Sequence, residues 1–201
     1  MLYVFEGLDG SGKSTLIRKV KKELEERGWE VKTIREPDKE YRDKVLASHN
    51  QVSIEDENAI FEECHNVLME EKVKPAIQRG YVILSDRSYL YSSLAYQTET
   101  PEEFYSRREY YTSNFELPQW VFLLNTDPEL CRARTFLPRE EEQSSFDKDN
   151  MDTYYARYRR YVAMSDFEEV IYVGGSDEDV INICDLIARS EEQGQWMRTR
   201  V

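Results

Sequence analysis

The chain has 201 residues, and its 40 acidic side chains against 27 basic ones give a formal net charge of -13. That charge disfavours binding to a nucleic-acid polymer or an anionic lipid surface. A hydrophobic content of 40% is too high for a disordered acidic tail, and no apolar run approaches the roughly 20 residues of a membrane helix. We therefore expect a globular protein whose partner is neither a membrane nor a nucleic acid.

The N-terminus reads MLYVFEGLDG and has no basic leader followed by a long apolar stretch. The three cysteines, at positions 64, 131 and 184, are far apart and form no CxxC pair or Cys/His cluster. These patterns predict a reduced, cytoplasmic protein without disulfides or structural zinc.

Short apolar runs and helical spacing of apolar residues alternate along the chain. The predicted strands cover 2–6, 29–36, 81–86, 119–125 and 169–173. The predicted helices cover 13–27, 53–75, 89–97, 102–113, 128–135, 151–163 and 177–190, with Pro75 expected to end or kink the second. This alternation predicts one α/β domain over 1–201, in which a mostly parallel five-stranded sheet carries helices on both faces. Ligands of such sheets bind beyond the carboxyl ends of the strands.

Two segments have weak patterns. Residues 136–150 (FLPREEEQSSFDKDN) are polar and highly charged, which predicts a mobile loop. Residues 191–201 are expected to form a frayed, flexible tail.

The strongest motif is GLDGSGKS at 7–14, which fits G-x-x-x-x-G-K-[ST] between an apolar strand and an amphipathic helix. Glycines in such a loop let backbone N–H groups turn inward, and the following helix adds its positive end to the anion site. Lys13 should reach the β- and γ-phosphates of ATP, and the Ser14 hydroxyl should ligate Mg²⁺. The flanking elements argue against a glycine-rich turn with a chance lysine. The expected nucleotide-binding residues are Gly7, Asp9, Gly10, Ser11, Gly12, Lys13, Ser14 and Thr15.

Further segments follow in a familiar order. They are FEGLDGSGKST, REP at 35–37, AIFEECHNVLMEEKVKPAIQRG, DRSYLYSSLAYQ, VFLLNTDPELCRAR and RRYV near 161. This combination resembles the thymidylate kinase family over most of residues 3 to 173. The resemblance implies a three-layer P-loop kinase fold with a mobile lid at about 136–150. It also implies a transferase of nucleotide biosynthesis that moves the γ-phosphoryl group of ATP to a deoxynucleoside 5′-monophosphate.

The resemblance also assigns roles to the catalytic and phosphate-binding residues. Arg35 and Arg87 match arginines that hold the acceptor monophosphate, which suits the planar guanidinium. Asp9 matches a carboxylate that contacts the sugar 3′-hydroxyl. Asp86, at the end of the third strand, faces the Mg²⁺–phosphate region and is the second expected metal ligand beside Ser14.

Residues around the acceptor base and sugar are implied in the same way. Phe61 matches an aromatic residue that stacks on the base, although its place on an apolar helical face equally fits a core role. Ser93 matches a small residue near the pairing edge of the base. Tyr96 matches a tyrosine that crowds the sugar 2′ position, and Gln97 lies beside it.

Family members carry a catalytic arginine in the phosphate loop or in the lid. The loop here has none, so Arg139 in the lid is the expected catalytic arginine. Arg132, Arg134 and Arg157 are expected to assist, with Arg132 on the ATP side. A solvated helix face is the expectation for Arg107, Arg108 and Arg160.

Three departures from the family pattern lie on the acceptor side. His65 stands where the family places a base-contacting arginine, and it is the substrate-binding residue expected at that position. Asp38 and Lys39 replace two glycines after REP, and Ser88 lengthens the DR segment by one residue. A mostly neutral ring cannot replace the donors of a guanidinium. The acceptor is therefore either dTMP or a deoxynucleotide with a modified pyrimidine or a broader range of bases.

The alternatives to this function are a deoxynucleoside kinase and a nucleotide-binding module without turnover. A kinase acting on DNA ends fits less well, because the acidic chain has no evident basic track. Family members are commonly dimers, so a homodimer through helices at 53–79 and 89–97 is an expectation by analogy.

Overall fold

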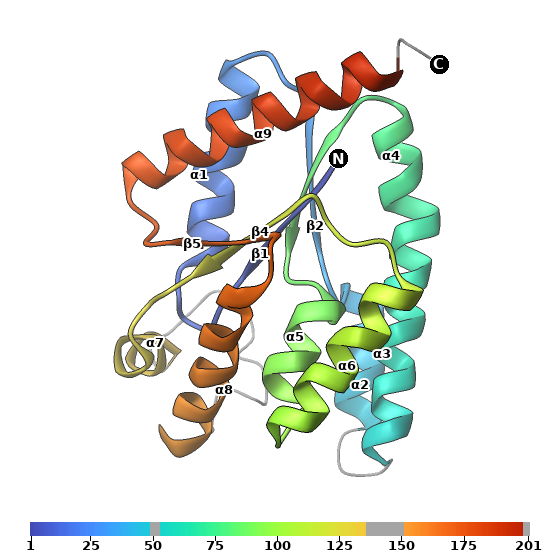
Figure 1. Cartoon of the computed structure of the whole chain (residues 1–201), viewed down its shortest axis with the longest axis vertical. Helices are drawn as coiled ribbons and strands as arrows, with labels where there is room; N and C mark the ends of the chain where they lie inside the picture. The colour runs from blue at the N-terminus through green and yellow to red at the C-terminus, as the bar shows by residue number, and fades with distance from the viewer. Residues whose placement is uncertain (49–52, 136–150, 199–201) are drawn as a thin grey trace.

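The computed structural model describes residues 1–48, 53–135 and 151–198. Its sheet has five strands in the order β2-β3-β1-β4-β5, and every neighbouring pair is parallel (Figure 1). The strands are β1 (Leu2–Glu6), β2 (Val31–Arg35), β3 (Val82–Asp86), β4 (Trp120–Leu124) and β5 (Val170–Val173). The predicted α/β class and parallel sheet are confirmed.

Helices follow or connect these strands. They are α1 (Lys13–Glu26), α2 (Lys39–Ser48), α3 (Ile54–Leu68), a π-helical segment (Met69–Val73), α4 (Lys74–Gln78), α5 (Tyr89–Tyr96), α6 (Pro101–Asn114), α7 (Pro128–Thr135), α8 (Met151–Ala163), a 3₁₀ turn (Met164–Asp166) and α9 (Asp177–Arg198). No helix of the described ranges is long and apolar enough to cross a membrane.

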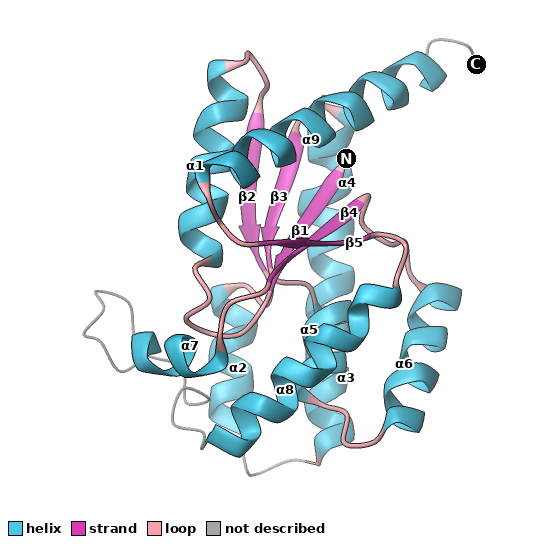
Figure 2. Cartoon of the chain, turned by 60° about the vertical axis from the view of Figure 1, so that its left-hand side comes forward, coloured by secondary structure: helices cyan, strands magenta, loops and turns pink. Residues whose placement is uncertain are grey.

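Side chains alternate across the central strand and build two cores. Tyr3 and Phe5 point to the face covered by α1 and α9, where they pack with residues such as Val20. Val4 points to the opposite face and packs with residues of α5, α6 and α8, including Tyr161. Figure 2 shows the sheet between these two helical layers. The near-continuous apolar character of the strands follows from burial on both faces.

Three element boundaries differ from the sequence predictions. Helix α2 was not predicted, because its buried anchor among the described side chains is a single tyrosine, Tyr41, against Cys64 and Leu68 of α3. Of the two outcomes expected at Pro75, an end or a kink, the end is wrong: helical residues continue to Gln78. A π-helical segment precedes the proline and places it in the first turn of α4, where its missing N–H is tolerated.

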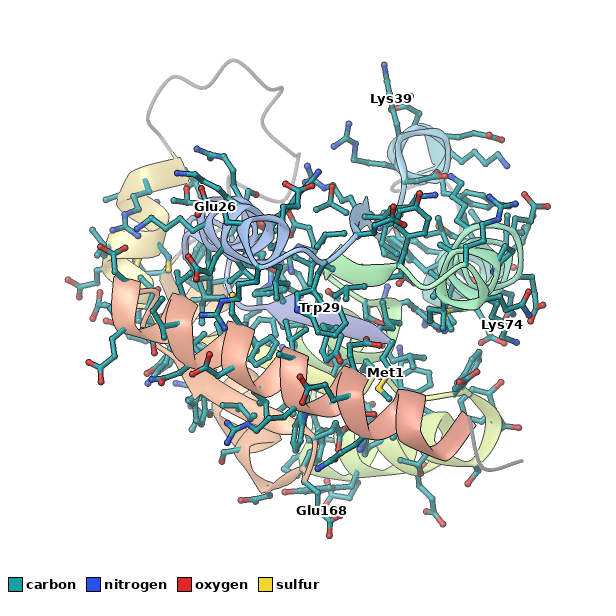
Figure 3. All side chains as sticks on the ribbon, turned by 90° about the horizontal axis from the view of Figure 1, so that it is seen from above. Met1, Glu26, Trp29, Lys39, Lys74 and Glu168 are labelled. Carbon is teal, nitrogen blue, oxygen red and sulfur yellow. The ribbon has the colours of Figure 1, made fainter. Side chains whose placement is uncertain are left out.

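The last helix continues to Arg198, through most of the segment expected to fray. Glu191 is 8% exposed and pairs with the Met1 ammonium, an N···O distance of 2.5 Å. Figure 3 shows Met1 beside α9, with Lys39, Lys74 and Glu168 pointing outward at the edges of the molecule. A contact between the two ends of the chain therefore holds α9 in place beyond its predicted end.

The strand register brings the site residues to one edge of the sheet. Asp86 is the partner of Phe5 on one side and of Arg35 on the other. The residues that follow β1, β2 and β3 therefore meet at the carboxyl edge, which is where ligands bind in parallel sheets.

Candidate active site

The loop between β1 and α1 depends on its glycines. Gly7, Gly10 and Gly12 have φ angles of 141°, 84° and 103°, a region that side chains disfavour. A Cβ atom on Gly10 would lie 2.2 Å from the Cys131 carbonyl oxygen on α7, so the loop also needs glycine for close packing. The sequence motif is thus realised as a tight backbone turn leading into the N-terminus of α1.

Lys13, the first residue of α1, directs its side chain back to the backbone of this loop. Its ammonium donates hydrogen bonds to the carbonyl oxygens of Gly7 at 2.9 Å and Leu8 at 2.8 Å, and the residue is 7% exposed. Burial lowers the pKa of Lys13 to about 8, and Arg87 adds to the lowering, while Asp9 and Asp86 partly oppose it. The ammonium is therefore a positive charge that an incoming anion would stabilise.

Ser14 and Asp86 provide two oxygen atoms next to the loop. The Ser14 hydroxyl donates to the Asp86 carboxylate across 3.0 Å. Mg²⁺ prefers oxygen ligands and usually keeps several waters alongside one or two protein ligands and phosphates. This donor set suits Mg²⁺ bound with a nucleotide, whereas the described residues contain no cluster of three His, Cys, Asp or Glu side chains for a metal held by protein alone.

Arg87 has the densest set of contacts. One guanidinium nitrogen, Nη2, donates to Asp9 at 2.5 Å and to the Tyr96 hydroxyl at 3.2 Å. The other, Nη1, donates to the Tyr161 hydroxyl at 3.1 Å and lies 3.5 Å from Glu6. The backbone of Arg87 has a φ of 76°, an uncommon conformation for a residue with a side chain. Such strain is typical of residues held for function.

The charges at Arg87 and Asp9 stabilise each other. Burial acts to raise the pKa of Asp9, but Arg87 and Lys13 hold it well below its ordinary range. Burial likewise acts to lower the pKa of Arg87, but Asp9, Tyr96, Tyr161 and Glu6 together outweigh burial and raise it. Both groups are therefore charged near neutral pH.

A cavity of about 180 Å³ opens beside Arg87. Its lining combines guanidinium groups, carboxylates, aromatic rings and small polar side chains. The lining residues are Asp9, Arg35, Glu36, Pro37, Arg42, Glu57, Phe61, Arg87, Tyr89, Ser92, Ser93, Tyr96, Gln97 and Arg157. The cavity thus has the chemistry to hold a molecule with an anionic part and a flat apolar part.

Most acceptor-side residues expected from sequence line this cavity: Asp9, Arg35, Phe61, Arg87, Ser93, Tyr96 and Gln97. The Phe61 ring stacks beside Tyr89 with centroids 6.3 Å apart. The Ser93 hydroxyl bonds to the Tyr111 hydroxyl at 2.7 Å, and Gln97 accepts a hydrogen bond from Arg107 at 3.1 Å. Both polar side chains are thus oriented by neighbours outside the cavity.

His65 does not line the cavity. It is 3% exposed, its Nδ1 lies 2.9 Å from a Glu36 carboxylate oxygen, and its ring meets Phe115 edge-on at 5.5 Å. Glu36, one residue after Arg35, does line the cavity. The histidine therefore contacts the cavity wall from behind.

The arginines expected to assist lie in different places. Arg157 of α8 lines the cavity, with its guanidinium 4.4 Å from the centre of the Tyr96 ring. Arg134 of α7 donates to the Gly10 carbonyl at 3.3 Å, and Arg132 lies on the same helix. Arg139 and the rest of 136–150 fall outside the described residues.

Three other arginines have more contacts than a solvated helix face provides. Arg107 bonds to Gln97, Arg108 pairs with Glu169 at 2.5 Å, and Arg160 donates to the Ala95 carbonyl at 3.0 Å. The expectation of a solvated face is wrong for them, because α6 and α8 pack against α5 and bring these side chains to partners.

Sequence reasoning missed Glu6 and Tyr161 in the Arg87 cluster. Glu6 carries a visible signal, since it is a charged residue at the end of an otherwise apolar strand, LYVFE. Tyr161 carries only the weak signal of the RRYV segment, and its place in the cluster depends on the packing of α8.

Comparison with known proteins shows the family to which the chain belongs. The family model described as thymidylate kinase matches residues 5–180. A protein named probable thymidylate kinase from Archaeoglobus fulgidus is 33% identical over 135 residues, covering 67% of this chain and 68% of that protein. The thymidylate kinase of Chlorobaculum parvum is 41% identical over 102 residues, covering 48% of this chain and only 46% of that protein. The thymidylate kinase of Thermosipho melanesiensis is 27% identical over 197 residues, covering 94% and 96% of the two chains. The chain therefore belongs to the thymidylate kinase family.

Proposed function

We propose that this protein transfers the γ-phosphoryl group of ATP to a deoxynucleoside 5′-monophosphate, giving ADP and a deoxynucleoside diphosphate. The observation that carries the proposal is the contact between Asp9 of the phosphate loop and Arg87 of the cavity, 2.5 Å between carboxylate and guanidinium. It joins a triphosphate-binding loop to an arginine-lined cavity. Donor and acceptor phosphates would thus meet at one edge of the sheet.

The donor side would hold ATP with Mg²⁺. Backbone N–H groups of the loop and the N-terminus of α1 would bind the phosphates, and Lys13 would exchange its two carbonyl partners for phosphate oxygens. Ser14 and Asp86 would hold Mg²⁺, which supplies neutralisation of the phosphate charge when bound.

The acceptor side would hold the monophosphate between Arg35 and Arg87. Asp9 accepts a hydrogen bond from one nitrogen of Arg87, so the acceptor phosphate would compete for that nitrogen and leave Asp9 available to the sugar hydroxyl. The base would lie toward Phe61, with Ser93 and Gln97 near its polar edge and Tyr96 beside the sugar.

Catalysis would consist of alignment and charge stabilisation, because the acceptor phosphate is already ionised and needs no general base. Arg157 lines the cavity and is one candidate for stabilising the transferred charge. Arg139 of the lid segment is the other, as the family resemblance implies.

The acceptor is dTMP, or a deoxynucleotide with a modified pyrimidine or a broader range of bases. His65 supports the second possibility, because it lies behind Glu36 and does not take the place of the base-contacting arginine of the family pattern. We further propose a cytoplasmic enzyme that acts on small nucleotides. A homodimer is also proposed; α5 is largely buried within the chain, so α3 is the better candidate surface of the two helices considered.

The test is a panel of acceptors assayed with ATP and Mg²⁺. It contains the four common deoxynucleoside monophosphates, 5-substituted pyrimidine monophosphates and the matching nucleosides. Turnover of monophosphates supports the proposal, and clearly best turnover of dTMP removes the modified-base option. Turnover of nucleosides alone, or ATP hydrolysis with no acceptor use, contradicts it.

A further inference from the structure

Glu6 is a buried carboxylate to which the reaction above assigns no role. It is the last residue of β1, directly before the phosphate loop, and it is 0% exposed. An ionised carboxylate in such a place is costly unless donors surround it. Its contacts therefore show what the fold uses it for.

Five donors converge on Glu6, one of them the backbone N–H of Gly7, which lies 3.4 Å from Oε2. One carboxylate oxygen, Oε1, accepts from the backbone N–H of Ser88 and the hydroxyl of Ser92, both at 2.8 Å. The other, Oε2, accepts from the Tyr161 hydroxyl at 2.9 Å and lies 3.5 Å from Nη1 of Arg87. Glu6 thus ties together β1, the turn after β3, α5 and the C-terminal end of α8.

These contacts fix Arg87 at both its backbone and its side chain. The N–H of Ser88 follows directly on the residue with the φ of 76°, so its hydrogen bond to Glu6 holds the strained turn. Tyr161 donates to Glu6 and accepts from Arg87 at 3.1 Å, so the carboxylate acts on Nη1 mainly through this hydroxyl.

The two nitrogens of Arg87 differ in their surroundings. Nη2 contacts Asp9, whose side chain is 25% exposed on the cavity side, whereas Nη1 faces the fully buried Glu6. A phosphate entering the cavity can compete with Asp9 but not with Glu6.

We propose that Glu6, acting with Tyr161, is a positioning residue that holds Arg87 in the orientation that binds the acceptor phosphate. This rests on the proposed function, since it assumes that Arg87 binds the acceptor. Glu6 touches neither substrate. It retains Nη1 and the backbone of Arg87 while Nη2 exchanges Asp9 for phosphate.

The variant Glu6→Gln tests this with little change of shape. Steady-state kinetics would be measured with varied acceptor and with varied ATP. We expect the acceptor KM to rise about tenfold, since a charge-assisted hydrogen bond contributes about 1.5 kcal/mol or more and 1.4 kcal/mol is tenfold. The ATP KM should change by less than about twofold. An unchanged acceptor KM, or equal rises in both KM values, would overturn the proposal.

Tyr161→Phe is the second variant, and it tests the positioning of Arg87 by itself if Glu6→Gln does not fold. It removes only the hydroxyl between Glu6 and Arg87, and we expect a rise of a few-fold in the acceptor KM alone. In the double variant the two effects should be less than additive, because both act through Arg87. Full additivity would contradict a shared action on this arginine.

Glu169→Gln is the matched control. Glu169 also accepts from an arginine nitrogen, Arg108 at 2.5 Å, and from a tyrosine hydroxyl, Tyr91 at 2.6 Å, but it does not line the cavity. The Glu169→Gln substitution should lower thermal stability without changing the acceptor KM. An acceptor KM that rises equally in this control would show a general packing effect. If the wild-type protein turns over no acceptor, the proposed function fails instead.

Discussion

The two halves of the site are built in different ways. The proposed donor half is a continuous loop, residues 7–14, joined by Asp86 from the end of β3, and most of the groups that would bind phosphate are backbone N–H groups held by glycine conformations. The acceptor half centres on Arg87 and draws side chains from β1, α5 and α8, including Glu6, Tyr96 and Tyr161. A backbone site needs few particular side chains, whereas a side-chain site depends on the packing of every contributing element.

This difference predicts where substitutions act. In the donor half, a single substitution of a glycine or of Lys13 should directly weaken ATP binding and lower turnover. In the acceptor half, effects should be shared among several residues and appear in the acceptor KM.

The largest expected effect is that of Lys13→Ala. Removing the ammonium deletes a charge that would stabilise the transferred phosphoryl group, and such a loss costs about 10²- to 10³-fold in turnover. The fold should persist, because Lys13 bonds only to loop carbonyls among the described contacts. Turnover assays measure the loss of activity, and circular dichroism measures whether the fold persists. The control is Lys19→Ala on the same helix, where an exposed lysine pairs with Asp177; near-normal turnover of Lys13→Ala would refute the donor assignment.

Arg87→Lys should give the next largest effect. Lysine keeps the charge but loses the planar fork that bonds Asp9 and Tyr161 at once, so we expect the acceptor KM to rise about tenfold or more. The ATP KM should stay nearly constant. Arg108→Lys, which alters a comparable buried arginine outside the cavity, is the control. Equal effects of the two variants on the acceptor KM would contradict the assignment of Arg87 to the acceptor half of the site.

A comparison of the variants Gly10→Ala and Gly28→Ala measures how much the close packing of the donor loop contributes to stability and to ATP binding. Both glycines have positive φ angles, 84° and 91°, so each alanine costs about 1–2 kcal/mol of strain. Only at Gly10 would the new Cβ meet a backbone atom, 2.2 Å from the Cys131 carbonyl oxygen, while at Gly28 nothing lies within 4 Å. Chemical denaturation should show the larger loss of stability for Gly10→Ala, and ATP binding should weaken in that variant alone.

The last prediction concerns the pH dependence of the donor half. Folding lowers the pKa of Lys13 from its ordinary 10.5 to about 8, so the unfolded chain binds more protons between these values. The free energy of unfolding contributed by Lys13 therefore rises with pH across that window. ATP binding needs the charged ammonium, so its Kd should rise above about pH 8, by at most tenfold per pH unit.

Calorimetric titration of a non-hydrolysable ATP analogue across this range measures that slope. The Lys13→Ala variant should show a flatter dependence. A wild-type Kd that stays constant up to pH 10 would contradict the proposed role of the ammonium.

The sequence predicted the strands and the donor loop well, because both are local patterns: short apolar runs and a spaced glycine–lysine motif. It predicted many lining residues of the cavity only through family resemblance. It did not predict α2, whose buried described anchor is Tyr41, or the extension of α9, which depends on Met1 meeting Glu191. Contacts between residues far apart in the chain leave no local signal.

His65 illustrates the same limit at the site. Its position in the family pattern predicted a contact with substrate, whereas the structure turns the ring toward Glu36 and Phe115. Arg107 was expected in solvent and instead orients Gln97. In both cases the side chain's direction depends on neighbours contributed by another helix, which sequence spacing does not reveal.

The strand order has a consequence for synthesis of the protein. The first strand, β1, lies in the middle of the sheet and pairs with β3 and β4, so it has no partner until the ribosome has made residues as far as 86 and 124. Parallel pairings over such separations are slow to form. The contact between Glu6 and Tyr161 closes 155 residues apart, so the acceptor half can be completed only late in translation. Incomplete chains would carry the whole donor motif without a working acceptor site.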